Sequence, residues 1–248
     1  MGKRRRMAEE ESTRSFIRLM SHELRTPLNS IIGFSEIIYQ ELYGPLAEPR
    51  YREHADYIRQ SGLKLLALVN QIMDIARLES GGADMDIHVQ PCGSPISDAI
   101  RSVQALANER NVTLEVRIPT PEPMVFCDHR GLETALVNLL HNAITFGCDG
   151  RLVVLEAQQE GSRLAISVQD FGCGIASDQI PRLLRPFEQG ENALVRHAAG
   201  AGLGLPTALL LTKAMGGTMS LSSEEGEGVR AIIRLQTSPP KPSVVKTA

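Results

Sequence analysis

The stretch from Ser21 to Leu42, S-H-E-L-R-T-P-L-N-S-I-I-G-F-S-E-I-I-Y-Q-E-L, decides the first half of the fold. Its apolar and small residues recur in steps that alternate between four and three residues. The rhythm begins a little earlier and gives the series Ile17, Ser21, Leu24, Leu28, Ile31, Ser35, Ile38 and Leu42. This heptad spacing predicts one long helix from about Ser12 to Tyr43.

A second helix follows a short break in which a glycine and two prolines stand between Tyr43 and Pro49. The heptad spacing resumes from about Arg50 to Leu78, and Ser80-Gly81-Gly82 ends it. A lone helical hairpin leaves one apolar flank of each helix in water. We therefore expect residues 12–80 to form a homodimer, as a four-helix bundle. Packing of one hairpin on the rest of its own chain is the alternative.

The composition is that of a globular protein without a role in binding nucleic acid. The 248 residues are 42% hydrophobic and 22% charged, and the net charge is -3. This charge disfavours a protein that neutralises phosphate backbones. No apolar stretch approaches the roughly 20 residues that span a bilayer, and no signal-peptide core precedes the first helix. We expect the fragment to be cytoplasmic and to contain no membrane segment. The full-length protein can still be anchored to a membrane by a part outside this sequence.

The cysteines and histidines show no spacing typical of a metal site. Four cysteines stand at 92, 127, 148 and 173 without a C-x-x-C motif, and the six histidines form no H-E-x-x-H motif. We interpret the cysteines as reduced, packing thiols. The histidines at 54, 88, 129, 141 and 197 are interpreted as residues without a catalytic role.

From about Ile87 onward the pattern changes to alternating helices and strands. It predicts helices over 95–110, 130–146 and 204–215, and strands over 112–118, 124–127, 151–158, 164–169, 218–222 and 229–235. The expected fold class is α+β with two domains: a helical hairpin forming a dimeric four-helix bundle, then an α/β sandwich of a mixed sheet covered by helices. The expected segments are a basic lead-in at 1–11, a helical domain at 12–80, a linker at 81–86, a second domain at 87–237 and a disordered tail at 238–248.

Two motifs in the second half favour nucleotide binding. Asn138 and Asn142, in N-L-L-H-N-A, lie one helical turn apart, where their amide oxygens can coordinate a Mg²⁺ that also holds phosphates. Asp170 follows an apolar strand, so its carboxylate can accept a hydrogen bond from an exocyclic amine. Gly172 and Gly174 after it let the backbone approach a planar base.

A third motif, G-A-G-L-G-L, leads directly into a helix. Its glycines are Gly200, Gly202 and Gly204, and the free N–H groups of the helix start favour a phosphate chain. Taken singly, the three motifs are also compatible with surface amides, an ordinary turn and a flexible loop. Their occurrence together and in this order favours the nucleotide site.

Five motifs in a fixed order carry a resemblance to a known family. They are S-H-E-L-R-T-P-L-N, N-L-L-H-N-A, D-F-G-C-G-I, R-P-F-E-Q and G-A-G-L-G-L. From about residue 12 to 236 the chain resembles the catalytic half of bacterial two-component sensor histidine kinases. The resemblance implies a dimerisation and histidine-phosphotransfer hairpin, then an ATP-binding domain of the kind shared with gyrase, Hsp90 and MutL. G-F-S-E-I-I-Y-Q-E-L-Y-G-P-L is similar to the alphaproteobacterial PleC/DivJ-like branch.

His22, Glu23 and Thr26 are the predicted catalytic residues. A neutral imidazole is a competent nucleophile near pH 7, and Glu23 can hydrogen-bond its other ring nitrogen and act as general base. Thr26 lies at i+4 from His22, and the resemblance to H-E-x-x-T kinases implies that it supports dephosphorylation of the partner. Pro27 is expected to bend the helix beside the histidine, because it has no N–H and crowds the carbonyl one turn back. An exposed histidine flanked by salt-bridging charges is the alternative.

The resemblance implies transfer of the γ-phosphoryl group of Mg-ATP to His22. ATP and Mg²⁺ are thus the expected cofactors, with Asn142 holding the metal, assisted by Asn138. The glycines of the third motif form the phosphate end of a lid at about 176–203, a segment long for a loop. Phe187, in R-P-F-E-Q, is predicted to anchor this lid through an apolar contact.

Thr145 departs from the family pattern, in which a lysine or arginine three residues after the second asparagine neutralises phosphate charge. Arg196 in the lid is the predicted substitute. The alternative function is a nucleotide-sensing scaffold or phosphatase with weak kinase activity. An ATPase clamp like the gyrase relatives does not explain the paired heptad helices. The expected partner is a response-regulator receiver domain on another protein, and phosphorylation within a subunit or across the dimer is left open.

Overall fold

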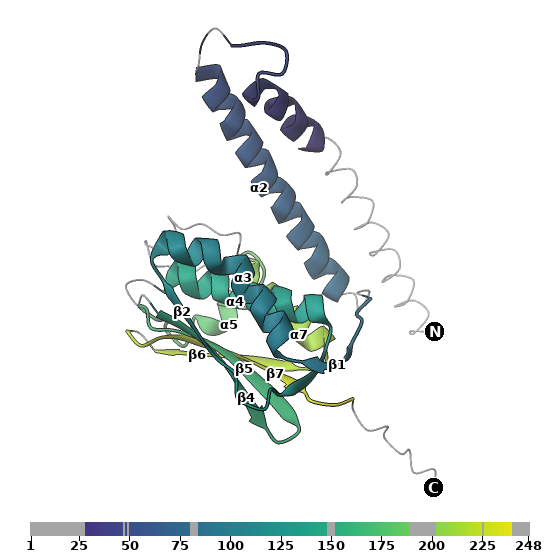
Figure 1. Cartoon of the computed structure of the whole chain (residues 1–248). Coiled ribbons are helices and arrows are strands. Elements are labelled where there is room, and N and C mark those ends of the chain that lie inside the picture. Colours follow the sequence, from purple (N-terminus) through teal and green to yellow (C-terminus); the bar gives the residue numbers. More distant parts are fainter. Residues whose placement is uncertain are drawn as a thin grey trace, which may run out of the picture. The chain divides into compact units, whose positions relative to one another are not determined.

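The computed structural model describes residues 28–46, 48, 50–79, 84–147, 152–188, 202–224 and 226–239. The chain divides into two compact units, residues 1–83 and 84–248, and Figure 1 shows both of them. Among the described residues, no helix combines the length and the apolar character needed to cross a membrane.

The first unit contains a helical hairpin. Residues 28–39 are helical, and α2 spans Arg50–Glu79 beside them (Figure 1). Gly44 in the connection has a φ of 116°, which glycine adopts without strain. The predicted pair of helices is confirmed over these residues. The first helix ends at residue 39, earlier than predicted, and residues 12–27 lie outside the described residues.

Close packing and one charged side chain join the two helices of the hairpin. A Cβ at Gly62 of α2 would lie 2.7 Å from Ile32 Cγ1, so a larger residue here would force the helices apart. Arg59 of α2 lies 3.4 Å from the Glu36 carboxylate and above the ring of Tyr39. These contacts fix the register of the hairpin.

The second unit is a sheet covered by helices on one face (Figure 1). Its five strands follow the order β2-β4-β5-β7-β6; β2 and β4 are parallel, and the other pairs are antiparallel. They are β2 (Thr113–Arg117), β4 (Leu152–Glu160), β5 (Arg163–Asp170), β6 (Thr218–Glu224) and β7 (Gly228–Gln236). The covering helices are α3 (Gly93–Arg110), α4 (His129–Phe146) and α7 (Gly204–Ala214). The predicted α+β class, a helical hairpin followed by a mixed sheet covered by helices, is confirmed, and the dimeric bundle stays a prediction.

The central helix α4 is positioned by its apolar stripe and by its N-cap. Leu132, Leu136 and Leu140 recur on one face and are fully buried. Asp128 caps the helix, because its Oδ1 accepts the Gly131 N–H at 2.6 Å. The helix is therefore fixed at its start and held along one face, which leaves the polar side chains of its other face for a site.

Two short elements were not predicted from the sequence. Strand β1 (His88–Pro91) pairs with β3 (Met124–Cys127) in a separate two-stranded sheet, and α5 (Ile180–Leu183) is a single turn. Four residues ending in proline carry no alternation that the pattern can reveal. β1 forms because its antiparallel partner supplies the hydrogen bonds.

The prediction of packing thiols is right for two cysteines and wrong for a third. Cys92 and Cys127 are fully buried, and burial raises the pKa of Cys92 to about 11 and that of Cys127 to about 12. Cys173 is exposed. It stands in the loop after β5, where the neighbouring glycines make close backbone contacts and the thiol lies 4.0 Å from the Phe146 carbonyl oxygen.

Candidate functional site

Two predicted amides of α4 lie directly against the start of α7. A Cβ at Gly204 would lie 3.2 Å from Asn138 Oδ1 and 3.4 Å from Asn142 Nδ2. Asn138 Nδ2 donates to the Thr134 carbonyl at 2.9 Å, so this amide presents its oxygen toward Gly204. The structure thus brings together three of the predicted residues, and an amide oxygen is available there as a ligand for a hard cation.

The first turn of α7 has features typical of a phosphate site. Its N-cap residue is Leu203, which offers no side-chain acceptor to the first N–H groups of the helix. Gly202, just before it, has a φ of 69°, and a Cβ there would lie 2.7 Å from the Glu188 carbonyl oxygen. The turn therefore requires glycine at residue 202, and it brings the backbone of Gly204 beside the amides of α4.

Asp170 is a buried carboxylate at the end of β5. Side chains alternate along a strand, so Asp170 shares the face of Ile166 and Val168 that the helices cover, and only 6% of it is exposed. Its Oδ1 accepts the N–H groups of Gly172 at 3.0 Å and Val229 at 3.2 Å. Burial raises the pKa of Asp170, and the two N–H bonds oppose that rise. The carboxylate is thus fixed in position, with both of these bonds on one oxygen.

Gly147 connects the two groups of site residues. It ends α4, and a Cβ on it would lie 3.3 Å from Asp170 Cβ. Gly172 packs with its backbone against the backbone of Gly147. Asn138 and Asn142 therefore lie along the same helix whose end touches Asp170, so one helix positions the predicted amide and carboxylate groups relative to each other.

The loop after β5 is fixed against the turn between β6 and β7. Gly174 has a φ of 68° and contacts the Glu224 carbonyl. The Ile175 N–H donates to Ser223 Oγ at 2.8 Å, and the Gly226 N–H donates to the Cys173 carbonyl at 2.8 Å. The glycines of this motif thus have a packing reason that is independent of any base.

Thr145, in the last turn of α4, carries a buried hydroxyl oxygen. Its Oγ1 makes no hydrogen bond with any residue in the described part of the chain. An unpaired buried hydroxyl costs about 1–3 kcal/mol. Because Thr145 stands in the last turn of α4, one turn after Asn142, a hydroxyl that needs a partner lies beside the candidate site.

Phe187 does not make the predicted apolar anchor, because 60% of it is exposed. Its backbone makes the connection: the Phe187 N–H donates to the Gly202 carbonyl at 3.1 Å, and its φ is 66°. The Arg182 guanidinium lies 2.7 Å from the Glu188 carboxylate in the same segment. Backbone pairing and an ion pair, rather than the ring, hold this end of the loop.

Other predicted site residues lie outside the described residues. They are His22, Glu23, Thr26, Arg196 and Gly200. The sequence reasoning missed Gly147 and Val229. A glycine just after a periodic helix is a signal that could have marked Gly147, whereas the role of Val229 rests on its backbone N–H and has no signal in the sequence.

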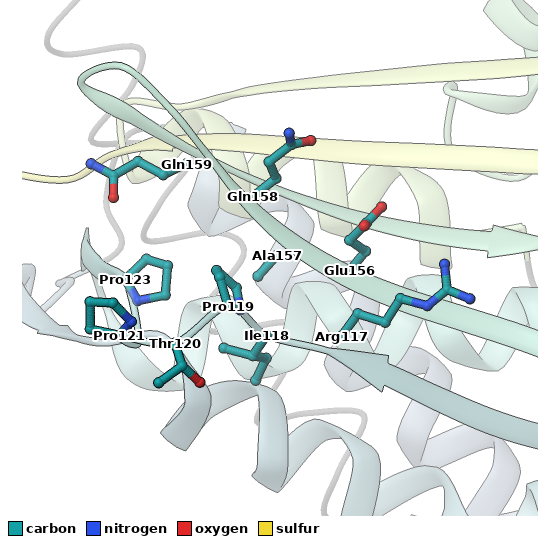
Figure 2. A pocket seen from close by; sticks show the side chains of 10 residues that line it. All are labelled: Arg117, Ile118, Pro119, Thr120, Pro121, Pro123, Glu156, Ala157, Gln158 and Gln159. Carbon is teal, nitrogen blue, oxygen red and sulfur yellow. The ribbon is translucent and has the colours of Figure 1, made fainter.

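A separate pocket opens beside β4, as Figure 2 shows. It has a volume of about 510 Å³ and is lined by residues 117–121, 123 and 156–159. The rings of Pro119, Pro121 and Pro123 form one side, and the end of β4 forms the other. None of the predicted site residues lines this pocket.

Two family models match the chain. Residues 12–81 match the His Kinase A (phospho-acceptor) domain, and residues 127–239 match the histidine kinase-, DNA gyrase B- and HSP90-like ATPase. Together the two segments cover well over half of the chain.

Curated relatives agree with these matches. The chain is 37% identical to an uncharacterised sensor-like histidine kinase of Rhizobium meliloti and 37% identical to the non-motile and phage-resistance protein of Caulobacter vibrioides. It is 35% identical to the cell-division control histidine kinase PdhS of Brucella ovis. The alignments cover 92%, 86% and 90% of this chain, but only 43%, 26% and 23% of these relatives.

Solved structures share the fold. Full-length ShkA in complex with AMPPNP has a TM-score of 0.76 and 27% identity, over 89% of this chain and 45% of that chain. The histidine kinase AdeS of Acinetobacter baumannii has a TM-score of 0.62 and 19% identity, over 87% of this chain and 98% of that one, which supports the fold alone.

Proposed function

Because the chain belongs to the sensor histidine kinases and resembles their two-domain catalytic core, we propose that it transfers the γ-phosphoryl group of ATP to His22. From His22 the group passes to an aspartate of a response-regulator receiver domain. The domains proposed for these steps are 12–80 and 87–237. The whole activity is a proposal, since the chain spans less than half of its curated relatives.

One observation carries the nucleotide part of the proposal. The start of α7 lies against the amides of Asn138 and Asn142, on the helix whose end contacts buried Asp170. A phosphate-binding helix start and a fixed carboxylate acceptor are thus joined by one rigid helix. A nucleotide needs these two features at its two ends, the phosphates and the base.

Each end of the nucleotide has a proposed partner. Asp170 accepts a hydrogen bond from the adenine amine, because two backbone N–H groups hold its Oδ1 and fix its orientation. The N–H groups at the start of α7 bind phosphate oxygens, with Gly200, Gly202 and Gly204 as the phosphate end of the lid. Positioning and charge neutralisation supply most of the rate acceleration in phosphoryl transfer.

The amides fit a magnesium ion. Asn138 presents Oδ1 toward Gly204, and Asn142 lies at the same place, so Asn142 with Asn138 would hold the ion beside the phosphates. When bound, Mg²⁺ neutralises the charge that develops on the phosphates. This chain's own contribution is to orient the amide oxygens and to keep residue 204 without a side chain.

At the phosphoacceptor, His22 is the nucleophile and Glu23 its orienting base. Attack of a ring nitrogen on the γ-phosphorus forms the N–P bond and releases ADP, while Glu23 takes the proton of the other nitrogen. Thr26 supports the opposing phosphatase activity by orienting a water that attacks the phosphorylated aspartate of the receiver and releases inorganic phosphate. The matched phosphoacceptor domain, residues 12–81, supports this assignment.

A homodimer through residues 12–80 is part of the proposal. The hairpin exposes a stripe of large apolar residues with exposed fractions between 45% and 68%: Ile31, Phe34, Ile38, Leu42, Ile58 and Leu65. Such a stripe marks an interface. Light scattering on the Ile38→Glu, Leu65→Glu double variant should give half the parental mass, and an unchanged mass would exclude this interface.

The proposed kinase reaction is tested with γ-labelled ATP and Mg²⁺. The parental protein should gain an acid-labile, alkali-stable label, and a His22→Ala variant should gain none. A His54→Ala variant, which changes a histidine of α2 without a proposed role, should label as the parent does. Equal labelling of the His22→Ala variant would exclude His22 as the acceptor.

The second candidate is a nucleotide-sensing scaffold or phosphatase with weak kinase activity. Thr145 favours it, because a threonine with a buried hydroxyl replaces the basic residue that the family has at this position. ATP binding without label, together with loss of label from a phosphorylated receiver, would favour this candidate over the kinase.

A further inference from the structure

Three side chains that the proposed kinase mechanism does not use converge between α3 and α4. Asp98 belongs to α3, and His129 and Glu133 stand one turn apart at the start of α4. Their potential ligand atoms all lie within 4.8 Å of one another. All three residues are partly exposed, so an ion can reach them from solvent.

A buried glutamine fixes which nitrogen of His129 carries the proton. Gln90 of β1 is 9% exposed, and its Nε2 donates to the Cys127 carbonyl at 3.1 Å. Its Oε1 is therefore the atom that lies 3.1 Å from His129 Nδ1, and a carbonyl oxygen can only accept. Nδ1 thus carries a hydrogen, and in the neutral ring the lone pair is on Nε2.

This lone pair faces a carboxylate. His129 Nε2 lies 2.9 Å from Asp98 Oδ2, and both atoms bring electron pairs to the contact when the ring is neutral. Either a second proton on the ring or a cation bound by both atoms resolves the conflict. The carboxylate of Glu133 adds a third ligand and a second negative charge on the same side.

Among the described residues, Arg101 places a competing positive charge beside the cluster. Arg101 Nη1 lies 3.0 Å from Asp98 Oδ1, the other oxygen of that carboxylate, and the Arg101 side chain is 77% exposed. An exposed ion pair of this kind contributes little. It occupies the outer oxygen and leaves Oδ2 to the cluster, so it weakens a bound cation without blocking it.

We propose that Asp98, His129 and Glu133 form a site for a divalent transition-metal ion of the Zn²⁺ class. A histidine whose other nitrogen donates to an oxygen acceptor is the usual arrangement of a metal ligand. Three protein ligands with a fourth, open position are a common zinc set, and tetrahedral bonds of about 2.0 Å separate ligand atoms by about 3.3 Å. Small rotations of these side chains reach that spacing.

The three proposed ligands disfavour Mg²⁺, the ion proposed for the nucleotide site. Magnesium prefers six oxygen ligands, whereas imidazole nitrogen favours Zn²⁺ and Co²⁺. A bound ion joins α3 to α4, and α4 carries the amides of the nucleotide site. The site therefore links metal binding to the stability of the second unit.

Binding is tested on the untagged full chain with Zn²⁺ and Co²⁺, without nucleotide. Co²⁺ should give visible absorption bands of a low-symmetry nitrogen and oxygen site, which Zn²⁺ removes and excess Mg²⁺ does not. At a hundredfold excess of Zn²⁺ over its Kd, the melting temperature should rise by about 5–10 °C.

Two variants and a matched control locate the site. His129→Asn and Glu133→Gln should each lose the Co²⁺ bands and the thermal shift, with folding checked by circular dichroism. His141→Asn changes an exposed histidine on the same helix, outside the cluster, and should keep both signals. Arg101→Ala should tighten Zn²⁺ binding, because it removes the competing charge.

The proposal fails in either of two outcomes. Absence of Co²⁺ bands in the parental protein would leave His129 and Asp98 as an ordinary ion pair. Bands and thermal shifts that persist in both His129→Asn and Glu133→Gln would place the bound ion elsewhere in the chain.

Discussion

Asn138 Oδ1 of α4 lies directly against Gly204 of α7, where a Cβ would lie 3.2 Å from this oxygen. The contact joins a helix in the middle of the chain to a glycine that comes more than sixty residues later. A Cβ at residue 204 would fit only if this amide moved by a few tenths of an ångström. The amide oxygen and the free N–H groups of that helix can therefore act on one ligand.

Gly204→Ala should weaken ATP binding by about tenfold, since the added methyl group displaces the amides by a few tenths of an ångström. Isothermal titration of a non-hydrolysable ATP analogue measures the affinity. Gly33→Ala is the matched control, because a Cβ at Gly33 meets nothing within 4 Å. If Gly204→Ala binds the analogue as tightly as the parent does, the contact between Asn138 and Gly204 plays no part in nucleotide binding.

Asp170→Asn should weaken ATP binding by about tenfold to a hundredfold. The amide still accepts the Gly172 and Val229 N–H bonds, but its nitrogen is a donor and cannot accept from the adenine amine. A GTP competition series should show less preference for adenine. Asp178→Asn, an exposed neighbour, should bind as the parent does, and an equal loss in both variants would contradict the role of Asp170.

The same variant should change how stability depends on pH. Burial raises the pKa of Asp170 above its ordinary 3.8, so in the window above 3.8 the folded protein binds more protons at this residue than the unfolded chain. The contribution of Asp170 to the free energy of unfolding therefore falls as pH rises through that window. The amide of asparagine does not titrate, so the Asp170→Asn variant lacks this pH dependence.

Urea unfolding of both proteins from about pH 4.5 to 7.5 measures the difference. The difference between the two free energies of unfolding, Asp170→Asn minus parent, should grow as pH rises until Asp170 is fully ionised. A difference that shrinks with rising pH would mean that the folded-state pKa is lowered.

Thiol reactivity should follow burial. In a Cys148→Ser background, exposed Cys173 should react with maleimide at least about a hundredfold faster than Cys92 or Cys127, whose pKa values are raised to about 11 and about 12. ATP analogue should slow labelling of Cys173, which lies between Gly172 and Gly174. Mass spectrometry of digested protein gives the three rates, and equal rates would contradict the burial of the pair.

Arg196→Ala should lower the autophosphorylation rate by about tenfold or more, if Arg196 supplies the positive charge that Thr145 does not. Thr145→Lys in the same protein should restore part of the rate. Arg163→Ala, an exposed arginine at the β4–β5 hairpin, is the control. If Arg196→Ala autophosphorylates at the parental rate, Arg196 does not replace the basic residue missing at position 145.

The sequence alone determined the elements whose side-chain pattern is long and regular. The spacing over 50–78 predicted α2, and the leucines of α4 predicted a buried face that the structure has. Periodicity succeeds here because one side of each helix must leave water along its whole length. The short motifs indicated the family that the two domain models also match, since each motif is a local arrangement of chemical groups, whereas the roles of their residues stay predictions.

Tertiary structure decided what depends on residues distant in the sequence. β1 exists because β3 pairs with it, and Asp170 is oriented by the N–H of Val229, 59 residues later. Phe187 pairs through its backbone, and His129 meets Asp98 across two helices. None of these leaves a local pattern, because a hydrogen bond or a ligand cluster is set by position in space, and folding alone brings such residues together.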